Sequence, residues 1–525
     1  MTRKAPSPFR ISHLDEPDIE FAGGQAKSPK RGLFRHGPRL KGGGESYVIN
    51  LGIVGDRDSI DRMTMLLSDM EFAVVPEQSG IDNSGSPEDE STSSSPERHE
   101  SDAFAENLFE GIPEDEEIHE QSEKPDITPS HIPFPGLVES DNLNVSMNVN
   151  RNWQLVFDDR RIQNVVDKPT MKAKIEKFLK RIEKKIRTLS NLSHGPEVVM
   201  VCIPEIIQEE CTSEGEKYAN VGIEGLDLHD QVKIQGMKNN LPTQVINNQT
   251  LYHDNKAKKA SKAYNLTAGM LYKAQDGHPW KTRDMREGVC YAGIVFYNRD
   301  EGRGREPNTH AALAHVFTKR GHNILQSGPL KDIEEDDNNQ PHLSHEAAEG
   351  TIEEVVSFYK ELNKGMTPRR LVLHKTSEYW PAERQGFLAG SPGVGIHDFV
   401  TIGTDTNLRL YPSGQYPAMR GTLLSVPEDD VHYLYTVGYA PAMATWEGTG
   451  VPGPIKIEPD EESCRTSGPE LAEEIMFLTK LDWNTTEFAV KMPITIKAGR
   501  KVATVLSEVD EEDIDDLAIK YLYYM

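Results

Sequence analysis

Short apolar runs alternate with helix-like segments in both halves of this sequence, and this alternation constrains the fold more than any other feature. In the first half, residues 47–54 (YVINLGIV) and 195–207 (GPEVVMVCIPEII) have the apolar, β-branched character of buried strands. In the second half, a strand-like run at 288–298 precedes a helical pattern at 346–363 and a further strand-like run at 369–375 (RRLVLHK). Strand–helix–strand order in both halves predicts two α/β domains.

Composition divides the chain into segments. Residues 1–45 are rich in Pro, Gly, Lys and Arg and are predicted to form a flexible, basic tail. We expect the first α/β domain, with the linker before it, at 46–280 and the second at 281–525. Residues 81–130 are predicted to be a disordered acidic insertion, either inert or a decoy that screens a nucleic-acid groove.

The net charge of -26 at pH 7 is unevenly distributed. Residues 81–128 contain 16 Asp or Glu against two basic residues, whereas basic residues cluster at 171–187 and 256–273. The first basic cluster has helical apolar spacing, which places Lys174, Lys177, Lys184 and Lys185 outside the core, either solvated or touching a phosphate backbone. A negative total therefore does not exclude a local nucleic-acid groove.

Cysteine and hydropathy patterns indicate a cytoplasmic protein. Four widely spaced cysteines without a CxxC pair argue against a disulfide framework or a zinc site. No apolar run is long enough to span a membrane, and the first residues lack the apolar stretch of a signal peptide. We interpret His310, His315 and His322 as surface or core residues rather than a metal site.

Four residues between 228 and 280 form a candidate phosphate site. His229 and Lys233 are one helical turn apart, Gln244 follows a turn-like LPT, and Lys273 closes an apolar helical stretch. Two cations, a ring N–H and an amide N–H suit a phosphate monoester. We expect the cations to face solvent in the empty protein. Spacing alone also allows a generic α/β phosphate-binding protein.

These residues stand in motifs that resemble the MID domain of Argonaute proteins: HDQVK at 229–233, PTQVI at 242–246 and NLTAGMLYKAQDGHPW at 265–280. The resemblance implies that His229, Lys233, Gln244 and Lys273 hold the 5′-phosphate of a guide strand. It also implies a Rossmann-like MID domain.

The second half resembles a PIWI domain, which implies an RNase H-like fold. The segments that carry this resemblance are GVCYAGIVFYN, RRLVLHKTSEYWPAE, YPSGQYPAMRGTLL, LYTVGYAPA and LDWNTTEFAVKMPITIKAGRKVATVL. The sequence ends in YLYYM, and the resemblance implies that the Met525 carboxylate helps to hold Mg²⁺ beside the guide phosphate. Together the two resemblances cover roughly residues 46–80 and 135–525.

The carboxylates of an active PIWI nuclease are not found at their expected positions. A two-metal site needs several converging carboxylates. By the resemblance, Val295 occupies the first position, Thr376 or its neighbour Lys375 the second, and Asn484 the third, with Asp482 close by. Asp300 and Glu378 are weaker replacements, so we expect no nuclease activity.

The resemblance therefore implies a short, MID–PIWI-only prokaryotic Argonaute that recognises without cutting. It would bind a guide RNA and a complementary single-stranded DNA target. Its partner would be an APAZ-domain effector carrying an NAD-degrading TIR or sirtuin-type module, or a nuclease, in prokaryotic immunity. The alternative is a guide-directed nuclease with a non-standard set of carboxylates.

Overall fold

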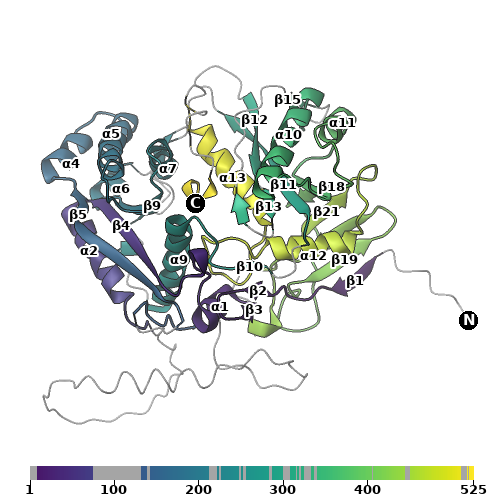
Figure 1. Ribbon diagram of the computed structural model, residues 1–525, viewed down its shortest axis with the longest axis horizontal. Helices are drawn as coiled ribbons and strands as arrows, with labels where there is room; N and C mark the ends of the chain where they lie inside the picture. Colours follow the sequence, from purple (N-terminus) through teal and green to yellow (C-terminus); the bar gives the residue numbers. More distant parts are fainter. Residues whose placement is uncertain are drawn as a thin grey trace, which may run out of the picture.

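The structure is a computed structural model, and it describes the chain in segments. These are residues 9–74, 132–138, 142–211, 222–223, 226–247, 250–251, 256–282, 286–299, 308–314, 316–318, 321–323, 333–335, 340–404, 406–443, 450–509, 513, 517 and 520–525. The predicted acidic insertion at 81–130 and Asp300 lie outside the described residues, as do the side chains of His310, His315 and His322. The expected mixed α/β architecture is confirmed (Figure 1).

The first α/β unit is built on a four-stranded parallel sheet in the order β5-β4-β6-β9. Its strands are β4 (Tyr47–Gly55), β5 (Val145–Val156), β6 (Val198–Cys202) and β9 (Thr243–Ile246). All five residues of β6 are buried, because the sheet is covered on both faces.

Helices cover the two faces of this sheet, and alternate side chains of its strands pack against the helices on opposite faces. Val198 and Met200 face the core shared with α2 (Arg57–Asp69) and α9 (Lys256–Gln275). Val199 and Val201 face the opposite core. That core is formed with α4 (Asp159–Val166), α5 (Met171–Ser190), α6 (Glu205–Cys211) and α7 (Leu228–Lys238). A short hairpin of β7 (Gly222–Ile223) and β8 (Leu226–Asp227) leads into α7.

The second unit is built on a mixed eight-stranded sheet in the order β1-β19-β20-β21-β18-β17-β11-β12, of which β11, β17 and β18 pair in parallel. Its strands are β1 (Arg10–His13), β11 (Val289–Arg299), β12 (Asn308–Ala314), β17 (Arg370–Lys375), β18 (Ile396–Gly403), β19 (Thr422–Val426), β20 (Val431–Leu434) and β21 (Ile455–Pro459).

Helices α10 (His345–Leu362) and α11 (Pro381–Ala389) cover one face of the mixed sheet. Helices α12 (Gly468–Leu478) and α13 (Ile494–Ser507) cover the other, and α13 lies at the junction with the first unit (Figure 1). Smaller elements are β13 (Val316–Thr318), β14 (Gly321–Asn323), β15 (Ile333–Glu335), β16 (Pro341–Leu343) and the 3₁₀ turn η3 (Pro441–Met443).

The predicted flexible tail at 1–45 is wrong for residues 9–45, which are packed along both units. Strand β1 pairs with β19, and β2 (Ile19–Glu20) joins β3 (Gln25–Ala26) and β10 (Lys281–Thr282) in a small sheet. The helix α1 (Pro29–His36) and the 3₁₀ turn η1 (Lys41–Gly43) follow. Three buried apolar residues and one partly buried carboxylate fix this segment: Ile19, Phe21, Leu33 and Glu16.

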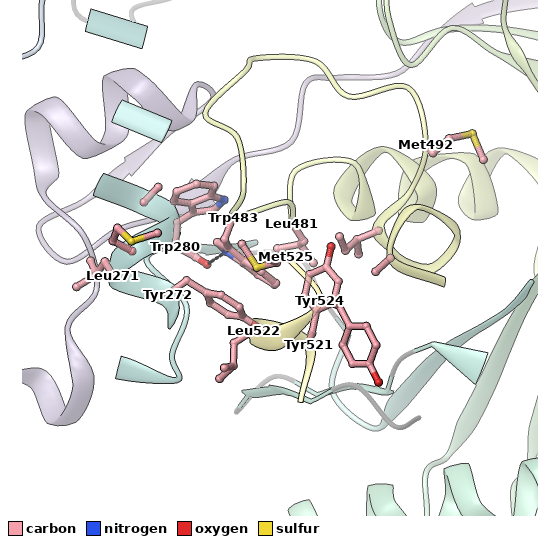
Figure 2. Packing of buried hydrophobic residues seen from close by; sticks show 14 of the residues in the cluster. Leu271, Tyr272, Trp280, Leu481, Trp483, Met492, Tyr521, Leu522, Tyr524 and Met525 are labelled. Atoms are coloured by element: carbon pink, nitrogen blue, oxygen red, sulfur yellow. Dashed lines mark hydrogen bonds between the residues drawn. The ribbon is translucent and has the colours of Figure 1, made fainter. Parts of the chain in front are cut away.

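The last residues of the sequence pack between the two units (Figure 2). The 3₁₀ turn η5 (Tyr521–Tyr523) is followed by Tyr524 and Met525, and both of these side chains are buried. Beside them, Tyr272 of α9 stacks on Trp483 with ring centroids 5.2 Å apart. The indole of Trp483 donates a hydrogen bond to the Trp280 carbonyl at 3.0 Å. This apolar contact fixes α9 against the loop before α13.

Candidate anion-binding site at the junction of the two units

The N-terminus of α7 orients the first two predicted residues. Asp227 caps the helix, and its carboxylate accepts hydrogen bonds from the backbone N–H groups of His229 and Asp230 at 2.7 and 3.2 Å. This cap starts the helix one residue before His229. His229 therefore lies in the first turn, and Lys233 lies one turn further on the same face.

Asp230 links the two predicted α7 residues. Its Oδ1 accepts a hydrogen bond from Lys233 Nζ at 3.1 Å and lies 3.1 Å from His229 Nδ1. Burial opposes the ionisation of Asp230, but the hydrogen bond from His229 and the charges of the neighbouring lysines outweigh burial and lower its pKa. An ionised carboxylate only accepts hydrogen bonds, so His229 Nδ1 carries the proton and donates.

The other two predicted residues meet the end of the sequence. Lys273 Nζ, on the last turn of α9, donates to Gln244 Oε1 at 2.6 Å and to the Thr243 carbonyl at 3.0 Å. It also donates to the main-chain oxygen of Met525 at 3.2 Å. Residues from β9, α9 and the C-terminal segment thus share one ammonium group.

A fifth residue, Lys501 of α13, joins the site, although no sequence motif pointed to it in this role. Its Nζ lies 3.6 Å from Asp230 Oδ1, and its side chain is 33% exposed. Lys501 also lines a cavity of about 380 Å³ together with Lys497, Arg500 and Met525. Residues 497, 500 and 501 fall on one face of α13, and a helical pattern of cations was the only available hint.

The cations of this site depress one another's pKa. Burial and the charge of Lys501 lower the pKa of Lys273 to about 7 and that of Lys233 well below its ordinary value. Burial, with the charges of Lys233 and Lys501, lowers the pKa of His229 to about 4. An anion placed among these groups would relieve this repulsion.

The expectation that the predicted cations face solvent is wrong. The side chain of Lys233 is 1% exposed, and Lys273 is 2% exposed. The structure places Lys233 beside Asp230, and it places Lys273 beneath Gln244 and Met525, where oxygen atoms satisfy the ammonium groups. Removing Lys273 therefore leaves Gln244, Thr243 and Met525 without this donor, whereas Asp230 keeps His229 when Lys233 is removed.

Asp227, His229 and Asp230 are also close enough to share a metal ion, and they form the one such group found among the described residues. One oxygen atom of each carboxylate already accepts hydrogen bonds, because Asp227 Oδ1 caps α7 and Asp230 Oδ1 accepts from Lys233. We therefore interpret the group as the polar support of the two predicted α7 residues.

The positions expected to hold nuclease carboxylates carry other chemistry. Val295 is buried on β11 and belongs to the apolar core beneath α13. Thr376 follows β17 and is half-buried. Next to it, the fully buried Lys375 donates to Glu383 Oε2 at 2.5 Å and to the Glu378 carbonyl at 2.9 Å. Two parallel strands that should bring carboxylates together thus bring a valine and an ion-paired lysine.

The assignment of Asn484 to the third nuclease position stays a prediction. Its side chain lies near Gly269 of α9, and it lines the cavity beside Met525. Asp482 is buried and pairs with Lys497. The residue that packs on β11 is Thr495, which lies against Gly293 and within 2.8 Å of His374 Nδ1.

The cysteines and the helices relate to the sequence-based expectations about disulfide bonds and membrane-spanning segments. All four cysteines lie in the described residues and are unpaired, with three of them buried. Among the helices of the described part of the chain, none combines the length and apolarity that a membrane crossing requires.

Comparisons with known proteins show what the chain resembles. No protein-family model matches the sequence, and no curated protein matches it. Three solved structures match with 96–98% of this chain covered. Clostridium butyricum Argonaute bound to a guide DNA and a 19-mer target DNA has a TM-score of 0.58 at 13% identity. Drosophila Piwi has a TM-score of 0.54 at 12% identity, and Marinitoga piezophila Argonaute in complex with 5′ OH guide RNA has 0.52 at 12%.

This chain spans 54%, 56% and 58% of the lengths of those three chains, respectively. At these identities the likeness is one of fold, and the two units together have an Argonaute-like fold.

Proposed function

We propose that this chain is a guide-directed nucleic-acid recognition protein. It binds the 5′-phosphate of a short guide RNA at the junction of its two units and presents the guide bases to a complementary single-stranded DNA target. Two of the solved structures with this fold are Argonautes that hold a guide, one of them together with a target DNA. Sequence recognition is then a matter of base pairing, while the protein contacts the backbones.

The observation that carries this proposal is the convergence of three lysines from three helices. Lys233 of α7 and Lys501 of α13 flank Asp230, and Lys273 of α9 contacts Gln244 and Met525. Charge-assisted hydrogen bonds from several donors are what a terminal phosphate requires. A dianion inserted here would draw Lys273 away from Gln244 and Met525 and would screen the lysines from one another.

His229 has a narrower role in this proposal than its sequence motif implies. Its Nδ1–H already points to Asp230, so the neutral ring offers a lone pair, not a donor, at Nε2. His229 then contacts the phosphate as a donor only after it takes up a proton. At neutral pH the lysines and Gln244 supply the attraction.

Mg²⁺ remains part of the proposal. Carboxylate and amide oxygens are ligands that Mg²⁺ accepts, and Met525 and Gln244 offer oxygens that now face the same ammonium group. Bound there, the ion would neutralise charge on the guide phosphate, whose oxygens would complete its coordination. Met525 and Gln244 would orient it.

We further propose that the chain does not cut its target and acts through an APAZ-domain effector in prokaryotic immunity. Val295 and Lys375 support this, because an apolar side chain and a buried ammonium group cannot hold two divalent ions. Asp482 and Glu378 are poor replacements for such ligands: Asp482 pairs with Lys497, and Glu378 is exposed, with its carbonyl accepting from Lys375.

Two measurements test these proposals. Nucleic acid extracted from the purified protein should be enriched in short 5′-phosphorylated strands, and an absence of enrichment would remove the guide proposal. Cleavage of a complementary DNA in Mg²⁺ or Mn²⁺ should be undetectable. A robust activity that disappears in Asp482→Ala or Glu378→Ala would establish the alternative, a nuclease with a non-standard carboxylate set.

A further inference from the structure

Helix α5 carries a concentrated positive charge on a chain whose total is strongly negative. Its 20 residues contain eight Lys or Arg against two Glu, whereas the whole chain has a net charge of -26. One face of the helix is apolar and buried, through residues such as Phe178, Ile182 and Ile186. The other face carries the basic residues, among which Lys172, Lys180 and Lys184 are exposed.

This positive charge is poorly compensated. Lys174 pairs with Glu210 at 2.5 Å, and Arg187 lies 3.5 Å from Glu183 on the same helix. Lys172, Lys180 and Lys184 have no carboxylate at ion-pair distance within the described part of the chain. An electrostatic consequence is visible at Lys185, whose pKa is lowered by burial and by the charges of Arg161 and Lys184, against the opposing charge of Asp158.

The basic face lies close to the proposed guide site without being part of it. Helix α5 packs on α7, which carries His229 and Lys233, and α4 packs on the other side (Figure 1). Arg160 of α4 is also exposed. From Lys172 to Lys184 the helix rises about 18 Å, at roughly 1.5 Å per residue.

We propose that the exposed face of α5 binds a nucleic-acid backbone outside the guide site, without reading its sequence. A duplex presents about one negative charge per 1.7 Å of its axis, so an 18 Å row of lysines meets several phosphates. Lysines are point charges on flexible stems, which suits phosphates and gives no base recognition. The local excess of positive charge on this face can attract a polyanion although the net charge of the chain is negative.

The experiment measures the binding of a duplex DNA as a function of salt concentration. The duplex has 5′-hydroxyl ends, so it lacks the terminal phosphate that the proposed guide site binds. The variant is Lys172→Gln/Lys180→Gln/Lys184→Gln in the full chain. The slope of log K against log salt should become shallower by about 2.7, at roughly 0.9 for each phosphate that the protein no longer neutralises. The double variant Lys180→Gln/Lys184→Gln should make the same slope shallower by about 1.8.

The matched control removes the same charge elsewhere, as Lys41→Gln/Arg57→Gln/Lys364→Gln, all of which are exposed. Its slope should equal that of the wild type. An unchanged slope in the α5 variants, or an equal change in the control, overturns the proposal. Polyglutamate serves as a second probe. If the α5 variant loses polyglutamate binding but keeps duplex binding, the partner is an acidic polypeptide and the proposal is wrong.

Discussion

Lys273 and Met525 are 252 positions apart, and the ammonium group of the lysine contacts the main-chain oxygen of the methionine at 3.2 Å. The same ammonium group contacts Gln244 of the parallel sheet. The Lys273 ammonium group therefore joins α9 to β9 and to the end of the sequence. A ligand bound at this point would contact residues of both units of the protein.

The first prediction concerns Lys501, the partly exposed cation of the site. Lys501→Ala should lose about 1.5–3 kcal/mol of affinity for a 5′-phosphorylated guide, the scale of a charge-assisted hydrogen bond. The thermal midpoint should change little, because the side chain is 33% exposed. Fluorescence anisotropy with a labelled guide gives the affinity.

Two controls make this measurement specific. Lys238→Ala removes a cation of α7 that pairs with Asp513 instead, and it should keep the wild-type affinity. The same guide with a 5′-hydroxyl should bind Lys501→Ala and wild type equally. Equal loss with both guide ends would show that Lys501 contacts something other than the terminal phosphate.

The second prediction concerns the buried lysine. Lys273→Ala should lose a similar 1.5–3 kcal/mol, roughly, of guide affinity and should also destabilise the fold by about 1–3 kcal/mol, because Gln244, Thr243 and Met525 lose their donor. Denaturant unfolding measures the second effect. Full stability together with reduced affinity would mean that these oxygens find another donor in the empty protein.

Central strands of both sheets could be predicted from the sequence because they are buried on two faces. Residues 47–54 are mostly apolar and residues 371–373 read LVL, and the structure has β4 at Tyr47–Gly55 and β17 at Arg370–Lys375. The helix containing His229 and Lys233 was also predictable, since a one-turn spacing is a local property.

The parts that could not be predicted depend on contacts between distant segments. Lys501 enters the site because α13 packs against α7, and no local pattern encodes that packing. Lys233 is buried beside Asp230, and the charge of Lys501 from α13 acts on it as well. No local pattern showed that Thr495 of α13 lies against Gly293 of β11. The N-terminal strands have two to four residues, too few to show periodicity.

The third prediction follows from the N-terminal segment. Glu16 Oε2 accepts from Arg420 at 2.8 Å and Oε1 from Lys480 at 2.5 Å, and both cations are 1% exposed. Glu16→Gln leaves two buried cations without a counter-charge and should destabilise the protein by about 3 kcal/mol. Thermal and denaturant unfolding measure the loss, and limited trypsin digestion should release residues 9–45 faster.

Glu20→Gln is the matched control, since Glu20 pairs with Arg39 and Lys281 at the surface, where the three side chains are 28–39% exposed. It should cost less than about 1 kcal/mol. A similar cost for both variants would mean that the Glu16 pairs contribute no more than a surface ion pair and that apolar packing alone holds the segment.

The fourth prediction concerns acid stability and His374, which is buried and lies within 2.8 Å of Thr495 Oγ1. Burial, with the charge of Arg370, lowers the pKa of His374 to about 3, whereas an unfolded chain titrates near 6.5. As the pH falls below about 6.5, the unfolded state takes up a proton that the folded state refuses. The contribution of His374 to stability is complete above that pH and is lost progressively toward pH 3. At pH 5 the loss amounts to about 2 kcal/mol.

His374→Asn keeps a group that can contact Thr495 and removes the titration. Its free energy of unfolding should therefore fall less between pH 7 and pH 5 than that of the wild type, by roughly the same 2 kcal/mol. His345→Asn, at an exposed histidine of α10, should retain the wild-type pH dependence. Parallel curves for all three proteins would show that His374 accepts its proton without unfolding. The cavity-facing helix α13, which carries Thr495, would then tolerate a charge on His374 of β17.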